Sequence, residues 1–187
     1  MEEKIKYINN SVVESLQFAE TKNAALITFN GAALYVFIEG REYLPSFFQN
    51  YVIEWSLFLV AAISISFFAF LPIMNPTPSP SQNEVKKREA LEDNVSIYYF
   101  GHIKLFTAEL LLNRIYSYYE VDIPKKYMRS ELDLTAQTIM LSRITWRKYF
   151  FFNIAGHLTL ITLVLPIPFL VAYWLVTYIK KKSDYKG

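Results

Sequence analysis

Two long stretches without a charged residue constrain what this chain can fold into. Residues 55–74 contain 20 positions and residues 149–179 contain 31, and neither stretch includes Asp, Glu, Lys or Arg. A helix needs about 20 consecutive apolar residues to cross the hydrocarbon core of a bilayer. A very apolar soluble bundle is the alternative, but its helices seldom run this far without a charge. The sequence therefore predicts an all-α integral membrane protein.

A shorter apolar stretch, residues 24–38, precedes these two. As a helix its 15 positions would cover about 22 Å at 1.5 Å per residue, which is short for a span. Lys22 can extend toward the lipid headgroups and so reduce the mismatch. A secretory signal is excluded because acidic residues precede the stretch, whereas a signal begins with a short basic segment. These acidic residues are Glu2, Glu3, Glu14 and Glu20.

Residues 1–23 carry an apolar residue at every third or fourth position, which is typical of an amphipathic helix. These residues are Ile5, Ile8, Val12, Leu16 and Ala19. No Pro or Gly separates this segment from the apolar stretch that begins at residue 24. We expect one long helix that Gly40 and Pro45 end.

The sequence thus predicts three transmembrane helices, two N-terminal and one C-terminal, with a mainly helical cytoplasmic region between spans two and three. Its segments are an amphipathic helix at 1–23, two spans at 24–74 joined by a short external loop at 41–54, a Pro-rich linker at 75–83, a cytoplasmic helical region at 84–148, a C-terminal span at 149–179 and a basic tail at 180–187. Three proline residues make the linker extended.

The distribution of Lys and Arg predicts the orientation. Residues 1–23 contain three, 39–54 one, 75–148 eleven and 180–187 four. The positive-inside rule therefore places the N-terminus and residues 75–148 in the cytoplasm. A single third crossing would then place the basic tail outside. Either residues 149–179 form one tilted span bent at Pro166 and Pro168, which we favour, or these prolines form a hairpin.

Within the polar region, the sequence predicts helices over 84–94, 104–119 and 130–150. Residues 95–103, "VSIYYFGHI", are aromatic and β-branched, which favours an extended segment with Gly101 as a turn or a close approach. Ser130 and Asp133 match a capping box at the start of the last helix. That helix continues without Pro or Gly toward the third span.

The chain lacks the residue patterns of common catalytic and metal sites. It has no Cys, its two His are 55 residues apart, and its five Gly form no phosphate-binding loop. No Ser lies in a nucleophile elbow. We therefore expect no enzymatic activity, no metal and no cofactor. The net charge of +2 is too small to indicate DNA or RNA as a partner.

Basic and aromatic residues of the polar region suit the phosphate and base of a nucleotide. The cations are Lys104, Arg114, Arg143, Arg147 and Lys148, and the stacking candidates are Tyr98, Tyr99 and Phe100. Arg147 and Lys148 directly precede the third span, where basic residues often anchor a helix to anionic headgroups. A ligand-binding role and a lipid-anchoring role therefore both remain open for these two residues.

Several polar or small residues of the spans suggest contacts between helices. Ala24, Thr28 and Gly31 fall on one helix face, where another helix could approach closely, and Asn30 is a candidate interhelical hydrogen bonder. Asn153 and His157 lie near the start of the third span, with either a gating or a structural role. Three spans alone cannot line a wide pore, so we expect a homo-oligomer.

Three stretches resemble one family in their order and spacing. They are "FAETKNAALITFNGA" at 18–32, "SIYYFGHI" at 96–103 and "LDLTAQTIMLSRITWRKYFFFNIA" at 132–155. They resemble the transmembrane effectors of bacterial Pycsar anti-phage defence. His102 departs from the family pattern, which often has an acidic residue there, so ligand or partner specificity can differ at this position.

The resemblance implies a mechanism. A partner cyclase, without any required direct contact, makes a cyclic pyrimidine mononucleotide (cUMP or cCMP), and the effector senses it and disrupts the bacterial inner membrane, which causes abortive infection. The candidate ligand-binding residues are then Tyr98, Phe100, His102, Lys104, Gln137, Arg143, Arg147 and Lys148. The alternatives are a membrane effector triggered by a cyclic oligonucleotide, a small membrane scaffold without nucleotide binding, and a transporter subunit, which the lack of paired intramembrane acids disfavours.

Overall fold

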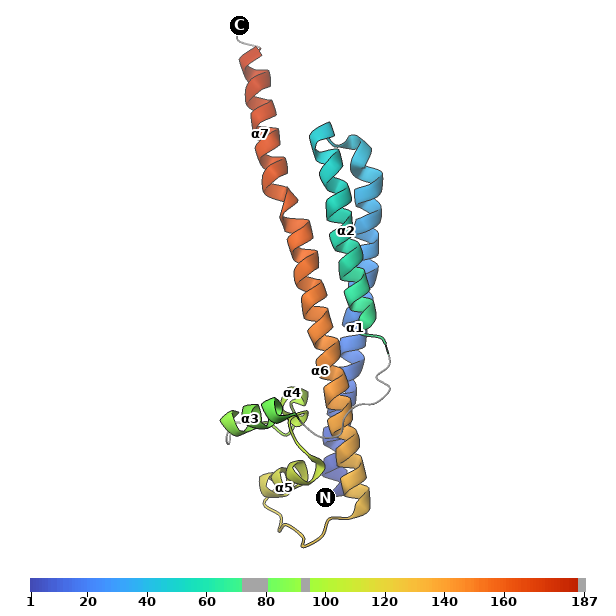
Figure 1. Cartoon of the computed structure of the whole chain (residues 1–187), viewed down its shortest axis with the longest axis vertical. Helices are drawn as coiled ribbons and strands as arrows, with labels where there is room; N and C mark the ends of the chain where they lie inside the picture. Colours follow the sequence, from blue (N-terminus) through green and yellow to red (C-terminus); the bar gives the residue numbers. More distant parts are fainter. Residues whose placement is uncertain (72–80, 92–94, 185–187) are drawn as a thin grey trace. The chain divides into compact units, whose positions relative to one another are not determined.

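The computed structural model of this chain describes residues 1–71, 81–91 and 95–184 (Figure 1), and every regular element in these ranges is a helix, as predicted. The elements are α1 (Glu2–Gly40), the short 3-10 helix η1 (Arg41–Tyr43), α2 (Ser46–Phe68), α3 (Gln82–Leu91), α4 (Phe100–Ile103), α5 (Ala108–Tyr118), α6 (Arg129–Val164) and α7 (Pro166–Asp184). Most of the predicted linker lies outside the described residues, as do 92–94 and the end of the basic tail.

The chain forms two compact units. We call residues 1–23 with 69–151 the polar unit, and residues 24–68 with 152–187 the apolar unit. Helices α1 and α6 each contribute their N-terminal part to the polar unit and their C-terminal part to the apolar unit. The predicted boundaries at residues 23/24 and 148/149 therefore lie close to the unit boundaries that the structure has.

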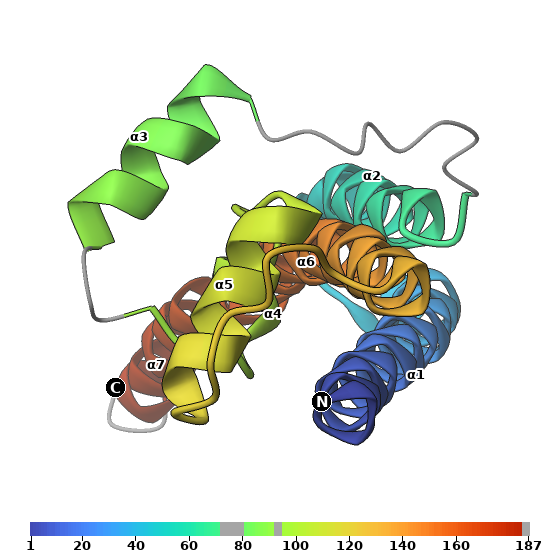
Figure 2. The ribbon, with the colours of Figure 1, turned by 90° about the horizontal axis from the view of Figure 1, so that it is seen from below.

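A single apolar core stabilises the polar unit. Helix α1 supplies the first three residues of the predicted stripe, α5 supplies three aliphatic residues, and α6 supplies Ile139, and all are nearly inaccessible to solvent. These core residues are Ile5, Ile8, Val12, Leu111, Leu112 and Ile115. Of the rest of the stripe, Ala19 is buried outside this core and Leu16 is half-buried. Figure 2 looks along α1 and α6 and shows the two helices side by side, with α5 next to α6. The prediction that α1 is one continuous helix ending at Gly40 is confirmed.

The segment 95–103 is only partly extended. Residues 95–99 have no helix, but α4 forms one turn from Phe100 to Ile103. The predicted close approach at Gly101 is confirmed, since a Cβ atom there would lie 2.5 Å from Cε1 of Tyr99. Helix α5 starts four residues later than predicted, because the side chain of Thr107 caps it by accepting from the backbone N–H of Leu110.

The capping box was predicted in the wrong place. Helix α6 begins at Arg129, so Ser130 lies inside its first turn, and the carbonyl of Met128 accepts from the Leu132 N–H. A capping box occurs instead at α3, where the Ser81 N–H donates to Glu84 Oε2 at 2.9 Å and the Glu84 N–H donates to Ser81 Oγ at 3.4 Å. The Ser-x-x-acid spacing therefore does not by itself mark a helix start, since it caps α3 at Ser81 but lies inside α6 at Ser130.

The predicted external loop at 41–54 was also wrong. Helix α2 begins at Ser46, nine residues before the uncharged stretch, and only η1, Leu44 and Pro45 separate it from α1. Gln49 closes this turn, because its side chain donates to the Leu44 carbonyl and its own carbonyl accepts from Arg41 Nε. The absence of charge marks where a helix can be in lipid, but it does not mark where the helix begins.

Helix α7 continues along the direction of α6 beyond Leu165 rather than folding back (Figure 1), so the structure has a bend at Pro166 and not a hairpin. Among the described residues, two helical stretches are long and apolar enough to cross a membrane, Ser46–Phe68 and Arg129–Ile179. The N-terminal span in α1 is not one of them, so the three-span arrangement stays a prediction.

Candidate functional site

A cluster of basic and aromatic side chains forms where α3, the end of α4 and α6 meet in the polar unit. We call it the basic cluster, and its members are Glu84, Lys87, Phe100, Lys104, Arg143, Trp146 and Tyr149. Lys104 is central to it: its Nζ lies 3.8 Å from Glu84 Oε1 and 4.2 Å from the centroid of the Trp146 ring. Arg143 Nε donates to the Lys104 carbonyl at 3.2 Å.

Aromatic rings form the other part of the basic cluster. The rings of Phe100 and Tyr149 are stacked, with centroids 5.1 Å apart and planes inclined by 11°. The Trp146 ring lies 6.5 Å from that of Phe100, and the Lys87 ammonium lies 5.8 Å from the Trp146 centroid. Flat aromatic surfaces beside cations can bind both parts of a nucleotide, since rings stack on bases and cations pair with phosphate.

The charges of the basic cluster are unequal, with Lys87, Lys104 and Arg143 around a single carboxylate, Glu84. Burial lowers the pKa of the Lys104 ammonium; the charge of Glu84 opposes this shift, while Lys87 and Arg143 add to it. Burial acts to raise the pKa of Glu84, but the hydrogen bonds from Ser81 and the charge of Lys104 outweigh it, so this pKa is lowered. Among the described members of the cluster, cations thus outnumber carboxylates, and an anion could pair with them.

The structure brings together three of the eight predicted ligand residues, Phe100, Lys104 and Arg143. Sequence reasoning did not select Glu84, Lys87, Trp146 or Tyr149. A signal existed for Trp146, which follows Arg143 by three residues and is its neighbour on the helix surface, and for Tyr149, which follows Trp146 by three. No local signal linked α3 to this site, because α3 is far along the chain from the residues of α6 that it meets there.

The other five predicted ligand residues lie elsewhere. The Tyr98 hydroxyl is 2.5 Å from that of Tyr119, in a group of tyrosine rings, and His102 Nδ1 accepts from the Ser96 N–H. Gln137 is exposed on α6. Arg147 and Lys148 line a different hollow of the polar unit, which Glu20 and Phe70 also line.

Small hydroxyl side chains line the buried face of α6 in the polar unit. We call Thr135, Thr138, Ser142 and Thr145 the hydroxyl seam; all are almost completely buried. Three of the four hydroxyls donate to the carbonyl four residues earlier in α6, at 2.8–2.9 Å. Because these bonds are internal to α6, they do not fix its position against a neighbouring helix.

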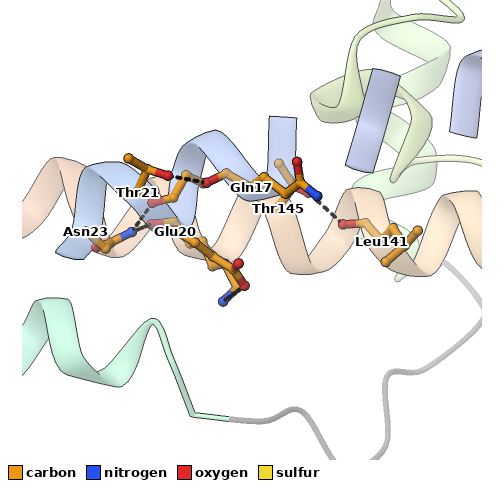
Figure 3. A network of polar contacts seen from close by, with 8 residues as sticks. Gln17, Glu20, Thr21, Asn23, Leu141 and Thr145 are labelled. Atoms are coloured by element: carbon orange, nitrogen blue, oxygen red, sulfur yellow. Dashed lines mark hydrogen bonds and ion pairs between the residues drawn. The ribbon is translucent and has the colours of Figure 1, made fainter. Parts of the chain in front are cut away.

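Few polar contacts join α1 to α6 directly in the polar unit. Near the N-terminus of α1, the Thr138 hydroxyl lies 3.0 Å from Asn9 Oδ1. At the other end, Lys148 Nζ pairs with Glu20 Oε1 at 2.8 Å, and Asn23 Nδ2 donates to the Lys148 carbonyl at 3.2 Å. Figure 3 shows Glu20 and Asn23 on α1, with Leu141 and Thr145 on α6. The Lys148 side chain is only 11% exposed. We call Glu20, Asn23 and Lys148 the latch.

The predicted intramembrane residues differ in burial. Asn30 is fully buried in the apolar unit, and neither polar atom of its side chain has a hydrogen-bond partner among the described residues. The Ala24, Thr28 and Gly31 face is exposed in the single chain, with the Thr28 hydroxyl bonded to the Ala24 carbonyl. His157 and Asn153 are exposed, and His157 Nδ1 lies 2.6 Å from the Asn153 carbonyl.

Comparison with known proteins identifies the family. No curated protein and no solved structure shows significant similarity to this chain. The family model of the Pycsar effector protein domain, in contrast, matches residues 4–176, a range that includes the basic cluster, the hydroxyl seam, the latch, the stretch Ser46–Phe68 and all but the last three residues of Arg129–Ile179. The chain therefore belongs to the Pycsar effector family and is a membrane-associated effector of anti-phage defence.

Proposed function

We propose that this effector is no enzyme and that it binds a cyclic pyrimidine mononucleotide, cUMP or cCMP, at the basic cluster. A partner cyclase makes the nucleotide, and binding causes the effector to disrupt the bacterial inner membrane and so abort the infection. One observation carries the proposal: Lys87, Lys104 and Arg143 gather with aromatic rings near the Glu84 carboxylate. Arg143 and Trp146 of this cluster are on α6, the helix that continues into the uncharged stretch 149–179.

The chemistry of the basic cluster fits such a ligand. A cyclic mononucleotide has one phosphodiester negative charge, one base and one 2′-hydroxyl. Lys104 and Arg143 would pair with the phosphodiester, and the ring of Trp146 would stack on the base. Glu84 would accept a hydrogen bond from the 2′-hydroxyl, which a carboxylate with a lowered pKa can do at neutral pH.

The hydroxyl seam supports a path from the cluster to the membrane-associated part of α6. Arg143 is in the basic cluster, while Ser142 and Thr145, its neighbours on the same helix, are in the seam. A ligand that moves Arg143 would move the seam with it, and the hydroxyls would keep their own carbonyl partners. Small shifts of packed helices are a common way to transmit a signal. In this chain such a shift would break the contacts of the latch, which are the ion pair between Glu20 and Lys148 and the hydrogen bond from Asn23.

The direct test is a thermal-shift panel on the purified full chain in detergent, with cUMP, cCMP, cAMP, cGMP and a cyclic oligonucleotide. We expect the melting temperature to rise only with a cyclic pyrimidine mononucleotide. Stabilisation by the oligonucleotide alone would favour the alternative signal, and stabilisation by none of them would contradict nucleotide sensing.

A matched pair of variants links binding to the basic cluster. Arg143→Gln removes a cation of the cluster, while Arg129→Gln removes one from the start of the same helix, where the Arg129 side chain is 94% exposed. We expect Arg143→Gln to weaken nucleotide binding at least tenfold and Arg129→Gln to leave it unchanged. Equal affinity of the two variants would move the nucleotide site away from the cluster.

The proposal includes an orientation with the N-terminus and residues 75–148 in the cytoplasm, and a homo-oligomer as the active form. The chain contains no Cys, so single cysteines introduced at exposed positions can be labelled without background. We expect a cysteine at Gln137 to resist a membrane-impermeant reagent in intact cells and one at Tyr43 to react with it. Crosslinking of a Thr28→Cys variant, in the exposed small-residue face, would test the oligomer.

A further inference from the structure

The polar unit contains a second place where positive charge is in excess. It is a hollow of about 300 Å³, lined by Glu20, Phe70, Leu71, Ile144, Arg147 and Lys148 together with Ala69. Two bases and one acid line it. Lys148 is paired with Glu20 at 2.8 Å, so the charge that remains is that of Arg147.

Arg147 has a contact that does not use its hydrogen-bond donors. Its guanidinium lies 5.4 Å from the centroid of the Phe151 ring, which is a cation–π contact. The N–H groups of a guanidinium in such a contact can still bind an oxyanion in a bidentate manner. In the described part of the chain, Arg147 forms no ion pair with a carboxylate.

The position of the hollow in the sequence indicates which anion reaches it. Arg147 and Lys148 are the last charged residues before the stretch 149–179, and Phe70 and Leu71 lie in the last third of the stretch 55–74, which begins in α2. The Phe70 and Leu71 side chains are exposed, and the Lys148 ammonium lies 5.3 Å from the Phe70 ring. Charged groups and exposed apolar groups thus meet where both stretches reach the polar unit.

We propose that this hollow binds the phosphodiester headgroup of an anionic phospholipid. Arg147 contacts the phosphate oxygens, Lys148 is shared between the phosphate and Glu20, and the acyl chains lie along Phe70 and Leu71. A cyclic mononucleotide carries the same phosphodiester charge, but it has no apolar chain to cover these exposed side chains. The phosphodiester of a lipid has both parts, which matches the composition of the hollow.

Bound lipid would act on the latch. The lipid phosphate and the Glu20 carboxylate both attract the Lys148 ammonium. An anionic headgroup therefore weakens the ion pair between Glu20 of α1 and Lys148 of α6, while Lys148 keeps a hydrogen-bond acceptor. The lipid composition of the membrane would then set how easily the seam between α1 and α6 moves. This inference does not depend on nucleotide binding at the basic cluster.

The experiment uses the full chain in nanodiscs of phosphatidylcholine alone and of phosphatidylcholine with phosphatidylglycerol. We expect a higher melting temperature in the anionic nanodiscs and phosphatidylglycerol retained on the protein in native mass spectrometry. Arg147→Gln should lose most of the stabilisation and retain several-fold less lipid, whereas Arg129→Gln should behave as the original chain does. Arg147→Lys, which keeps the charge but not the bidentate geometry, should fall between them.

Three outcomes would overturn the proposal. The first is equal stability of the original chain in both kinds of nanodisc. The second is an unchanged effect of phosphatidylglycerol in both Arg147 variants. The third is loss of cUMP stabilisation in detergent on Arg147→Gln with lipid retention unchanged, which would assign the hollow to a soluble nucleotide. Failure of Arg147→Gln to fold would leave Arg147→Lys and the original chain as the deciding comparison.

Discussion

In the polar unit, α5 and α1 meet α6 through different kinds of side chain. Helix α5 contributes Leu111, Leu112 and Ile115 to the apolar core, and the Tyr116 hydroxyl donates to the buried Glu131 carboxylate on α6. The hydroxyl seam of α6, which meets α1 at Asn9, consists in contrast of small side chains, three of which bond within their own helix. Large side chains that interdigitate fix one packing of two helices. Small side chains that bond within their own helix allow several.

This difference separates a fixed part of the molecule from an adjustable part. The α5 contact fixes one side of α6, and the basic cluster is built beside it. The hydroxyl seam lies on the α1 side of α6, where Asn9 and the latch supply polar contacts beside the apolar stripe of α1. A sensor needs both features, because a rigid site binds its ligand well and only a movable helix can transmit the result.

The largest effect should come from breaking the fixed part. Leu112 is fully buried in the core, and its replacement by Ala should cost about 2–5 kcal/mol of unfolding free energy, because it removes apolar contacts and leaves a cavity. Chemical denaturation in detergent measures this cost. Leu110→Ala on the same helix is the control, since Leu110 is 42% exposed, and it should change stability little. Similar costs for both variants would mean that α5 does not pack as described.

Sequence reasoning recovered the fixed part better than the adjustable part. The 3.6-residue spacing of Ile5, Ile8 and Val12 predicted a buried stripe, because a continuous apolar face has few other uses in a helix. The hydroxyl seam was missed because Thr and Ser at similar spacing read as polar residues of an exposed face. Their burial depends on hydrogen bonds to their own helix, which a hydropathy pattern does not contain.

The next effect should come from opening the latch. Glu20→Gln removes the partner of a Lys148 ammonium that is 11% exposed, and this should cost about 1–3 kcal/mol. The cost should stay below that of a fully buried pair, because the Glu20 side chain is 45% exposed. A double-mutant cycle with Lys148→Met measures the coupling. Additive effects of the two substitutions would show that the pair contributes nothing to holding α1 on α6.

The hydroxyl seam itself should show a smaller effect that differs by position. Thr138→Val loses the contact with Asn9 and should cost about 1 kcal/mol, the usual net value of a hydrogen bond. Thr145→Val loses only a bond within α6, so its stability should change by less than about half of that. Thermal unfolding of the two variants in parallel makes the comparison, and a reversed order would show that the seam is fixed by contacts other than Asn9.

The basic cluster illustrates another limit of prediction from sequence. Phe100, Lys104 and Arg143 were selected because their chemistry suits a nucleotide, and they do meet. Lys148 has the same chemistry and lies instead in the latch, because one helix can direct neighbouring basic residues to different partners. Glu84 was missed because only the tertiary fold brings α3 to Lys104. Residue chemistry indicated the kind of site, and packing decided which residues formed it.

The smallest effect should be the pH dependence that Glu84 gives to the basic cluster. The pKa of Glu84 is lowered in the folded chain, so its contribution to stability is complete above the unfolded value of 4.5 and is lost as the pH falls through the lower folded pKa. Glu84→Gln should remove this contribution and flatten the dependence of the melting temperature on pH below 4.5. Glu89→Gln on the same helix is the control, because Glu89 is exposed, and its profile should match that of the original chain. A Glu84→Gln profile that also matches would mean that Glu84 is not held by Ser81 and Lys104 in solution, and the site would then lose the acceptor proposed for the 2′-hydroxyl of a nucleotide.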